Sequence, residues 1–257
     1  MSWYVRLARP LVILVGLLVL WELVVWLSGV PFYILPAPHE VAVAWAARRA
    51  LILEHWVITT AEILLGLAIG SVLGCSSALI MGYFRPARRW LLPVLVTSQA
   101  IPVFAIAPLL VLWLGYGMAS KVAMATLIIY FPVTAAFYDG LRRTEPGWLD
   151  LARTMGGSRW AALRHIRIPA ALPALASGLR VATAVAPIGA IVGEWVGSSA
   201  GLGYLMLHAN ARMQIDLMFA ALITLAVFAV ALYFSVDTVL RRALPWQVET
   251  NPSDERE

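Results

Sequence analysis

The sequence predicts an all-α integral membrane protein with about six transmembrane helices. Of its 257 residues, 61% are hydrophobic and only 13% are charged, whereas a soluble domain has roughly 45–50% apolar and about 25% charged residues. The apolar residues gather in long blocks separated by short polar or arginine-containing segments. This composition excludes a soluble globular domain, a disordered chain and a nucleic-acid-binding module, despite the net charge of +5.

Six apolar blocks supply the predicted spans. A bilayer core is about 30 Å thick, so a crossing helix needs about 20 predominantly apolar residues. The candidate blocks comprise residues 11–30, 57–82, 90–115, 122–138, 170–193 and 217–236. With their connections they form one predicted membrane domain, residues 1–244. A polar tail, residues 245–257, follows and is expected to be disordered.

The first and third blocks differ from the other four. The first follows Arg6 and Arg9, as the apolar region of a secretory signal would. Its apolar stretch is about 20 residues long against about 7–15 in a signal, so we interpret it as a retained span. The third is the least regular, because Pro93, Pro102 and Pro108 are able to bend or break a helix.

The basic residues predict the orientation. Arginines concentrate at the N-terminus, after the second block, between the fourth and fifth blocks, and after the sixth. The alternate loops hold only Arg48, Arg49, Lys121 and Arg212. Because loops rich in Lys and Arg stay in the cytoplasm, both termini are predicted to be cytoplasmic, as is the longest loop, residues 139–169. On the outer side, residues 41–53 are a candidate surface helix and residues 198–216 a segment that dips back toward the bilayer.

No constellation in the chain predicts catalysis. The four histidines lie in separate segments, and the sequence contains neither H-E-x-x-H nor G-x-S-x-G. Lys121, the only lysine, follows a serine and therefore belongs to no Walker A phosphate-binding loop. The single Cys75 excludes a disulfide within the chain. We expect no catalytic residue, no metal site and no cofactor here, so that any ATP and Mg²⁺ would be bound by another subunit.

The first half of the cytoplasmic loop has the pattern of a short amphipathic helix. Thr144 is a candidate N-cap, with Pro146 in the first turn. Leu151, Ala152 and Met155 would lie on one side of this helix. The arginines would lie on the other side.

The second half of the loop predicts a turn and another helix. Gly156 and Gly157 end the first helix, and Ser158 is placed to cap a second one that runs to about Ile166. Pro169 would mark a break before the fifth span. The resulting knob suits the groove of a partner protein, although a basic loop that only fixes topology accounts for the pattern equally well.

The same loop resembles the EAA loop of ATP-binding-cassette importer permeases, written E-A-A-x3-G-x9-I-x-L-P. The matching positions are Asp150, Leu151, Ala152, Gly156, Ile166, Ile168 and Pro169. The spacing is kept throughout, with Asp for Glu, Leu for the first Ala and Ile for Leu. The resemblance implies the type I importer permease architecture, in which this loop is the coupling helix that docks on an ATP-binding subunit.

Further stretches resemble the nitrate, sulfonate and taurine permease group. These are residues 34–38, residues 101–115, and Gly193-Glu194-Trp195 followed by residues 201–204. Residues 187–197 and 208–214 are similar to permeases for thiamine pyrimidine precursors such as hydroxymethylpyrimidine. The resemblance thus implies uptake of a pyrimidine precursor, with a nitrate-, sulfonate- or taurine-type substrate as the alternative and an ion-gradient-driven transporter as a distant one.

The resemblance also implies partners and a location. Two copies of an ATP-binding subunit would bind on the cytoplasmic side, and a substrate-binding protein would deliver the ligand outside. A second copy of the chain would complete a homodimer in the lipid bilayer of the bacterial cytoplasmic (inner) membrane. A membrane enzyme is a further alternative that the absence of converging polar residues disfavours.

Polar groups and prolines inside the blocks are the candidates for the translocation pathway. Gln99, Pro102, Pro108 and Glu194 are the pathway or gate candidates, because charges and freed backbone groups must face protein or water. Glu194 is flanked by a stripe of Gly189, Gly193 and Gly197, which equally fits a contact between helices or subunits.

Three other charges inside the blocks receive structural interpretations. Glu62 is expected to pair with an arginine of a neighbouring helix. Arg180 either reaches the cytoplasmic surface or pairs with a carboxylate, and Glu22 receives no role.

Overall fold

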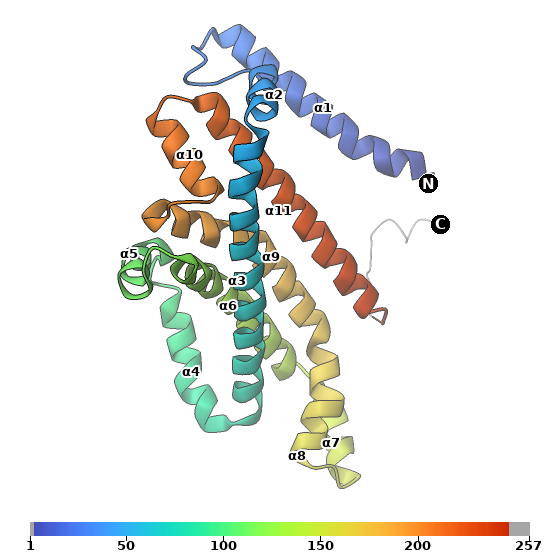
Figure 1. The fold of residues 1–257 in the computed structure, drawn as a ribbon. Coiled ribbons are helices and arrows are strands. Elements are labelled where there is room, and N and C mark those ends of the chain that lie inside the picture. Colours follow the sequence, from blue (N-terminus) through green and yellow to red (C-terminus); the bar gives the residue numbers. More distant parts are fainter. Residues whose placement is uncertain (1–2, 247–257) are drawn as a thin grey trace. The chain divides into compact units, whose positions relative to one another are not determined.

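A computed structural model of the chain describes residues 3–246, and their side chains from residue 12 onward. The described residues form helices and connecting turns without a strand, which confirms the predicted all-α class (Figure 1). The helices are α1 (Trp3–Ser28), α2 (Pro38–Ala47), α3 (Arg49–Tyr83), α4 (Arg85–Ser98), α5 (Val103–Leu114), α6 (Met118–Arg142), α7 (Pro146–Thr154), α8 (Arg159–Ala162), α9 (Ile168–Gly197), α10 (Leu202–Ala211) and α11 (Ile215–Ala243).

The described residues divide into two compact units. The first contains residues 3–59 and 199–226, and the second contains residues 60–198 and 227–246. Helices α3 and α11 each contribute residues to both units. The single functional domain over residues 1–244 stays a prediction. Of the predicted polar tail, residues 247–257 lie outside the described part of the chain.

Every predicted apolar block is helical over most of its length. Four helical stretches are long and apolar enough to cross a membrane: Arg49–Tyr83, Met118–Arg142, Arg159–Gly197 and Ile215–Ala243. Helices α4 and α5 add a fifth if they form one broken span. In α1 the apolar stretch with described side chains, Val12–Ser28, is shorter, so a first span over residues 11–30 stays a prediction.

The third block is broken. Helices α4 and α5 are bent by 103° relative to each other. Pro102 is the residue that stops the helix, because it has no N–H to donate and disfavours a helical conformation of the residue before it. It then serves as the N-cap residue of α5. Pro93 and Pro108 remain inside α4 and α5, so two of the three prolines break nothing.

The expected surface helix at residues 41–53 has different bounds. Helix α2 begins at Pro38, where the Glu40 carboxylate accepts a hydrogen bond from the Ala37 N–H at 2.9 Å. It ends before Arg48, and α3 starts at the next residue. Residues 49–53 therefore belong to the first turns of α3, and the span predicted at 57–82 is longer than expected.

Glycines bring α3 against α6 in the second unit. Gly66, Gly70 and Gly74 lie four residues apart on one face of α3. A Cβ atom added to these glycines would lie 2.5 Å from the Ala125 Cβ, 2.7 Å from the Ile129 Cγ2 and 2.9 Å from the Val133 Cγ1, respectively. Small residues at this spacing let two helix backbones approach closely in a membrane.

The other side of α6 packs on α9 in the same way. A Cβ at Gly189 would lie 2.6 Å from the Ala125 Cα, and one at Gly193 would lie 3.1 Å from the Lys121 Cα. Gly197, the third residue of this stripe, faces Val111 of α5, and an added Cβ there would lie 2.8 Å from the Val111 Cγ1. The glycine stripe around Glu194 is therefore used for packing within the chain.

In the first unit, side chains of α3 hold the start of α10. The His55 ring accepts a hydrogen bond from the Gly201 N–H at its Nδ1 (2.9 Å), and the Thr59 hydroxyl accepts one from the Leu202 N–H at 2.7 Å. The first amides of a helix have no partner inside the helix. His55 and Thr59 supply these partners, and the segment predicted at residues 198–216 is thereby tied to α3.

Candidate functional site

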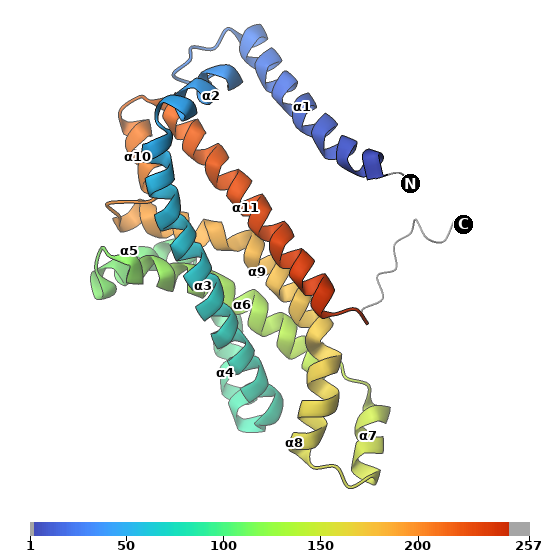
Figure 2. The ribbon, with the colours of Figure 1, turned by 45° about the vertical axis from the view of Figure 1, so that its right-hand side comes forward.

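The loop between α6 and α9 forms two antiparallel helical segments at one end of the α6–α9 pair (Figure 2). Its first helix, α7, begins at Pro146 with Glu145 as the N-cap residue. The predicted cap at Thr144 is wrong: Thr144 is buried and donates its hydroxyl hydrogen to the Leu141 carbonyl at 3.3 Å. Pro146 makes a side-chain cap less necessary, because its fixed φ suits the first helical position and one orphan N–H is absent.

The glycine pair ends α7 as the sequence predicts. The Gly157 N–H donates to the Ala152 carbonyl at 2.8 Å, and the Gly156 N–H donates to the Arg153 carbonyl at 2.9 Å. These two bonds are the Schellman arrangement, which needs a left-handed residue after the helix. Gly156 adopts φ +73°, and a Cβ there would meet no atom within 4 Å. The requirement for glycine at this position is therefore conformational and does not come from a clash.

The second segment starts as predicted but continues further. The Ser158 hydroxyl accepts a hydrogen bond from the Ala161 N–H at 3.1 Å, which confirms it as the cap. Beyond α8, residues Leu163–Arg167 form one π-helical turn, and the chain passes directly into α9. The predicted break at Pro169 is wrong. The π turn, in which the Ile168 N–H donates to the Leu163 carbonyl, precedes Pro169, and the proline lies in the first turn of α9, where its missing N–H is tolerated.

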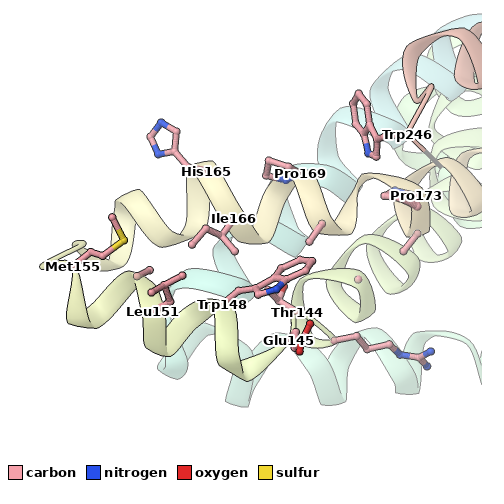
Figure 3. A pocket seen from close by; sticks show the side chains of 15 residues that line it. Thr144, Glu145, Trp148, Leu151, Met155, His165, Ile166, Pro169, Pro173 and Trp246 are labelled. Carbon is pink, nitrogen blue, oxygen red and sulfur yellow. The ribbon is translucent and has the colours of Figure 1, made fainter. Parts of the chain in front are cut away.

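An apolar groove lies between the two segments, with a volume of about 970 Å³ (Figure 3). Figure 3 shows Leu151 and Met155 directed from α7 toward the segment that carries Ile166. Of the predicted loop residues, Leu151, Ala152, Ile166 and Pro169 line the groove. Ile168 packs instead on the buried cluster around Phe137 and Leu141.

Large apolar side chains remain exposed around this groove. Leu151 and Met155 keep 60% and 79% of their surface accessible, and Trp148 is also exposed. A gathering of exposed apolar side chains on one surface marks a site of interaction with another molecule. Asp150 lies on the exposed surface of α7, where its carboxylate accepts a hydrogen bond from Arg153 at 2.7 Å.

Arg167 ties the loop to the ends of two long helices, a role that the sequence analysis missed. Its guanidinium donates from Nε and Nη2 to the Leu141 carbonyl, at 3.1 and 2.9 Å, and from Nη1 to the Gly82 carbonyl at 2.9 Å. The last carbonyls of a helix lack intrahelical donors, so one arginine satisfies α3 and α6 together. The sequence signal for this role was the position of the arginine, immediately before Ile168-Pro169 and near the level at which the neighbouring spans end.

A second group of functional candidates lies inside the helices. Glu62, Lys121 and Glu194 are 0%, 4% and 1% exposed. Lys121 Nζ lies 3.3 Å from Glu62 Oε1, so the expected arginine partner of Glu62 is wrong and the partner is a lysine. The Glu194 carboxyl group lies beside that of Glu62, within reach of a side-chain hydrogen bond.

Arg180 and Glu22, the other two charges predicted inside the blocks, each lie beside a titratable side chain. Arg180 donates to Asp237 Oδ1 at 2.7 Å, so it pairs with a carboxylate, the second of the two predicted alternatives. Glu22, which received no role, lies 3.5 Å from the His39 ring on the exposed surface of the first unit.

The other pathway candidates surround the break in the third block. Gln99 is the C-cap residue of α4, and Pro102 precedes the first turn of α5. Both are exposed, as is Pro108 inside α5. Glu194 differs from them in being fully packed. The assignment of these four residues to a translocation pathway stays a prediction.

Comparisons with known proteins agree on one family. The family described as "Binding-protein-dependent transport system inner membrane component" matches residues 66–246. A "Probable ABC transporter permease protein" of Haemophilus influenzae is 57% identical over 95% of this chain and 99% of its own length.

Two relatives carry a substrate in their names. "Riboflavin transport system permease protein RibX" of Chloroflexus aurantiacus is 38% identical over 92% of this chain and 89% of its own. "Formylaminopyrimidine transport permease protein ThiX" of Halalkalibacterium halodurans is 35% identical over 93% of this chain and 96% of its own.

A solved structure supports the fold. An inward-facing form of the MetNI methionine ABC transporter superposes with a TM-score of 0.65, covering 76% of this chain and 97% of the compared chain at 17% identity. The predicted type I importer permease architecture is thereby confirmed.

Proposed function

This chain belongs to the family of binding-protein-dependent transport system inner membrane components, and on that premise we propose that it couples ATP hydrolysis on a separate subunit to the uptake of a small polar solute. In this role it forms the translocation pathway and transmits movement, but it carries out no catalysis itself. The proposal assigns coupling to the loop that contains α7 and α8.

The attachment of that loop to the long helices is the observation that carries this proposal. Helix α7 and the segment after Ser158 present an apolar groove edged by exposed Trp148, Leu151 and Met155. Such a surface fits a partner protein better than water. Arg167 connects the same loop to the last turns of α3 and α6, and the loop continues without a break into α9. A displacement imposed on the loop is thus passed to three long helices.

The assembly that follows from this assignment has several chains. Two ATP-binding subunits, which hold ATP and Mg²⁺, dock on the coupling loops of two identical permease chains on the cytoplasmic side. A substrate-binding protein delivers the solute on the outer side. The basic residues support the orientation, with both termini cytoplasmic in the bacterial inner membrane.

The named relatives support a class of substrate. Formylaminopyrimidine and riboflavin, the substrates in the names of two relatives, are both planar nitrogen heterocycles that contain a pyrimidine ring. We infer that this chain transports such a heterocycle, with a thiamine pyrimidine precursor of the hydroxymethylpyrimidine type as the first candidate. A sulfonate or taurine substrate is the alternative, supported by a taurine permease of Escherichia coli at 26% identity.

Transport by the reconstituted complex tests both the importer mechanism and the substrate class. The chain, purified with its ATP-binding subunit and substrate-binding protein, is placed in proteoliposomes and supplied with labelled hydroxymethylpyrimidine. We expect uptake of the labelled compound to require ATP. Riboflavin or formylaminopyrimidine should reduce this uptake by competition, and taurine should leave it unchanged. Competition by taurine alone would reassign the substrate. Uptake driven by an ion gradient without ATP would reject the importer and favour a secondary transporter.

A further inference from the structure

Three ionisable side chains meet inside the second unit, away from the coupling loop. Glu62 comes from α3, Lys121 from α6 and Glu194 from α9. At least 96% of the surface of each is buried. The Lys121 ammonium lies 3.3 Å from Glu62 Oε1, and the Glu194 carboxyl group lies beside that of Glu62. Nothing in the proposed coupling mechanism uses this cluster.

Close helix packing holds the three groups in place. Gly193, the neighbour of Glu194, lies against the backbone of Lys121, where an added Cβ would be 3.1 Å from the Lys121 Cα. Gly66, one turn after Glu62, lies against Ala125, one turn after Lys121. A Cβ added to Gly66 would lie 2.5 Å from the Ala125 Cβ. The three helix backbones therefore fix the separation of the charged groups.

The charges of the cluster do not balance. Lys121 contributes one positive charge, whereas two ionised carboxylates contribute two negative charges. An uncompensated charge at the centre of a bilayer costs on the order of 2.5–3.5 kcal/mol on insertion scales. One further positive charge would make the cluster neutral.

The hydrogen bonding of Glu62 also indicates that the cluster lacks one proton or positive charge. In the part of the chain that the structure describes, neither carboxyl oxygen of Glu62 has a hydrogen-bond donor in suitable geometry. An ionised carboxylate only accepts hydrogen bonds, so two ionised carboxylates side by side cannot satisfy each other. A carboxylic acid beside a carboxylate can, because its O–H becomes the missing donor.

We propose that Glu62 and Glu194 together bind one proton, so that the cluster of Lys121, one carboxylate and one carboxylic acid is neutral within the membrane. The proton is held between α3 and α9. Because the bound state depends on the two helices staying packed, separation of α9 from α3 would hydrate both carboxyl groups and release the proton. The cluster is therefore a proton-binding site whose occupancy depends on the packing of α9 against α3.

Infrared spectroscopy of the purified full-length chain near neutral pH tests this directly. A protonated carboxylic acid has a C=O stretching band that is separate from the carboxylate bands and moves to lower frequency after exchange into D₂O. Exposed acids are ionised at this pH and do not contribute to the band. We expect the wild-type protein to show the band both with and without sodium in the buffer. Its absence in both buffers would overturn the proposal without any variant. A band that appears only after sodium is removed would also overturn it, because the natural occupant would then be a metal cation.

Two variants and a control locate the proton. Glu62→Gln and Glu194→Gln should each abolish the band, because the single remaining carboxylate pairs with Lys121. Glu54→Gln, an exposed acid on the same helix as Glu62, should leave it unchanged. Circular dichroism and gel filtration verify that each cluster variant is folded. Persistence of the band in both folded variants would place the proton elsewhere and refute the assignment.

Discussion

The packed centre of α3, α6 and α9 and the exposed pair of α7 and α8 use glycine for different physical reasons. In the centre, an added Cβ at Gly66 or Gly189 would lie 2.5 or 2.6 Å from an atom of Ala125. At the loop, Gly156 has open space around it but a left-handed backbone with φ +73°. The centre is therefore sensitive to side-chain volume, whereas the loop is sensitive to backbone conformation.

The two regions also use ion pairs differently. Lys121 and Glu62 are buried, so removing Lys121 would leave a buried carboxylate without its counter-ion. Asp150 and Arg153 are solvated and only bridge one turn of α7. Stability should thus depend on the centre, and binding to another subunit should depend on the loop.

The largest effect is expected from Lys121→Met. Removing one partner of a buried pair typically costs about 3–5 kcal/mol, so we expect a large fall in the free energy of unfolding. The matched change Arg153→Met removes the exposed pair and should cost less than about 1 kcal/mol. Chemical unfolding in detergent measures both, and similar losses in the two variants would contradict the distinction between the regions.

The second-largest effect is expected from overpacking the centre of α3, α6 and α9. Gly189→Leu must displace the α6 backbone at Ala125, and inserting methylenes into a packed core costs about 1–3 kcal/mol or more. The control is Gly16→Leu in α1, because a Cβ at Gly16 meets no atom within 4 Å. Thermal unfolding should show a lower midpoint for Gly189→Leu alone. An unchanged midpoint would mean that the α6–α9 contact yields easily.

A smaller and local effect is expected for two alanine substitutions in the loop. Gly156→Ala forces a Cβ into the left-handed region, at a cost of about 1–2 kcal/mol. Gly147→Ala lies within α7 without a positive φ and should be neutral or stabilising by about 0.4–1 kcal/mol. Hydrogen exchange of the amides of residues 152–161 should accelerate only in Gly156→Ala. Equal exchange in both variants would argue against the Schellman turn.

The smallest effect on stability is expected from Asp150→Ala. The exposed pair contributes less than about 1 kcal/mol, so the unfolding midpoint should stay nearly unchanged. The proposed coupling role nevertheless predicts weaker binding of the ATP-binding subunit, measured by co-purification. Full retention of that subunit would remove Asp150 from the coupling surface.

Local chemistry made part of this structure predictable from sequence. Gly156 and Ser158 act through bonds to residues within five positions of themselves, so their roles as helix stop and cap follow from the pattern. Leu151, Ala152 and Met155 share a face because of helical periodicity alone. The apolar blocks follow from the thickness of a bilayer.

Non-local packing explains the errors and omissions. Thr144 looks like a cap but is buried against Leu141. Arg167 donates to carbonyls that lie 26 and 85 residues earlier in the sequence, at Leu141 and Gly82. The Lys121–Glu62 pair depends on the rotation of α3 and α6, which one sequence does not reveal. Of the prolines in the third block, only tertiary structure distinguishes Pro102 from the two that a helix absorbs.

Isolation of the tagged chain from its own membranes in mild detergent, with mass spectrometry of the proteins that accompany it, tests the central claim most directly. We expect an ATPase with a Walker motif to accompany the wild type and Gly147→Ala. It should be lost from Gly156→Pro, because proline fixes φ near −65° and Gly156 has φ +73°. Recovery of the wild-type chain alone, active in uptake without ATP, would contradict the account.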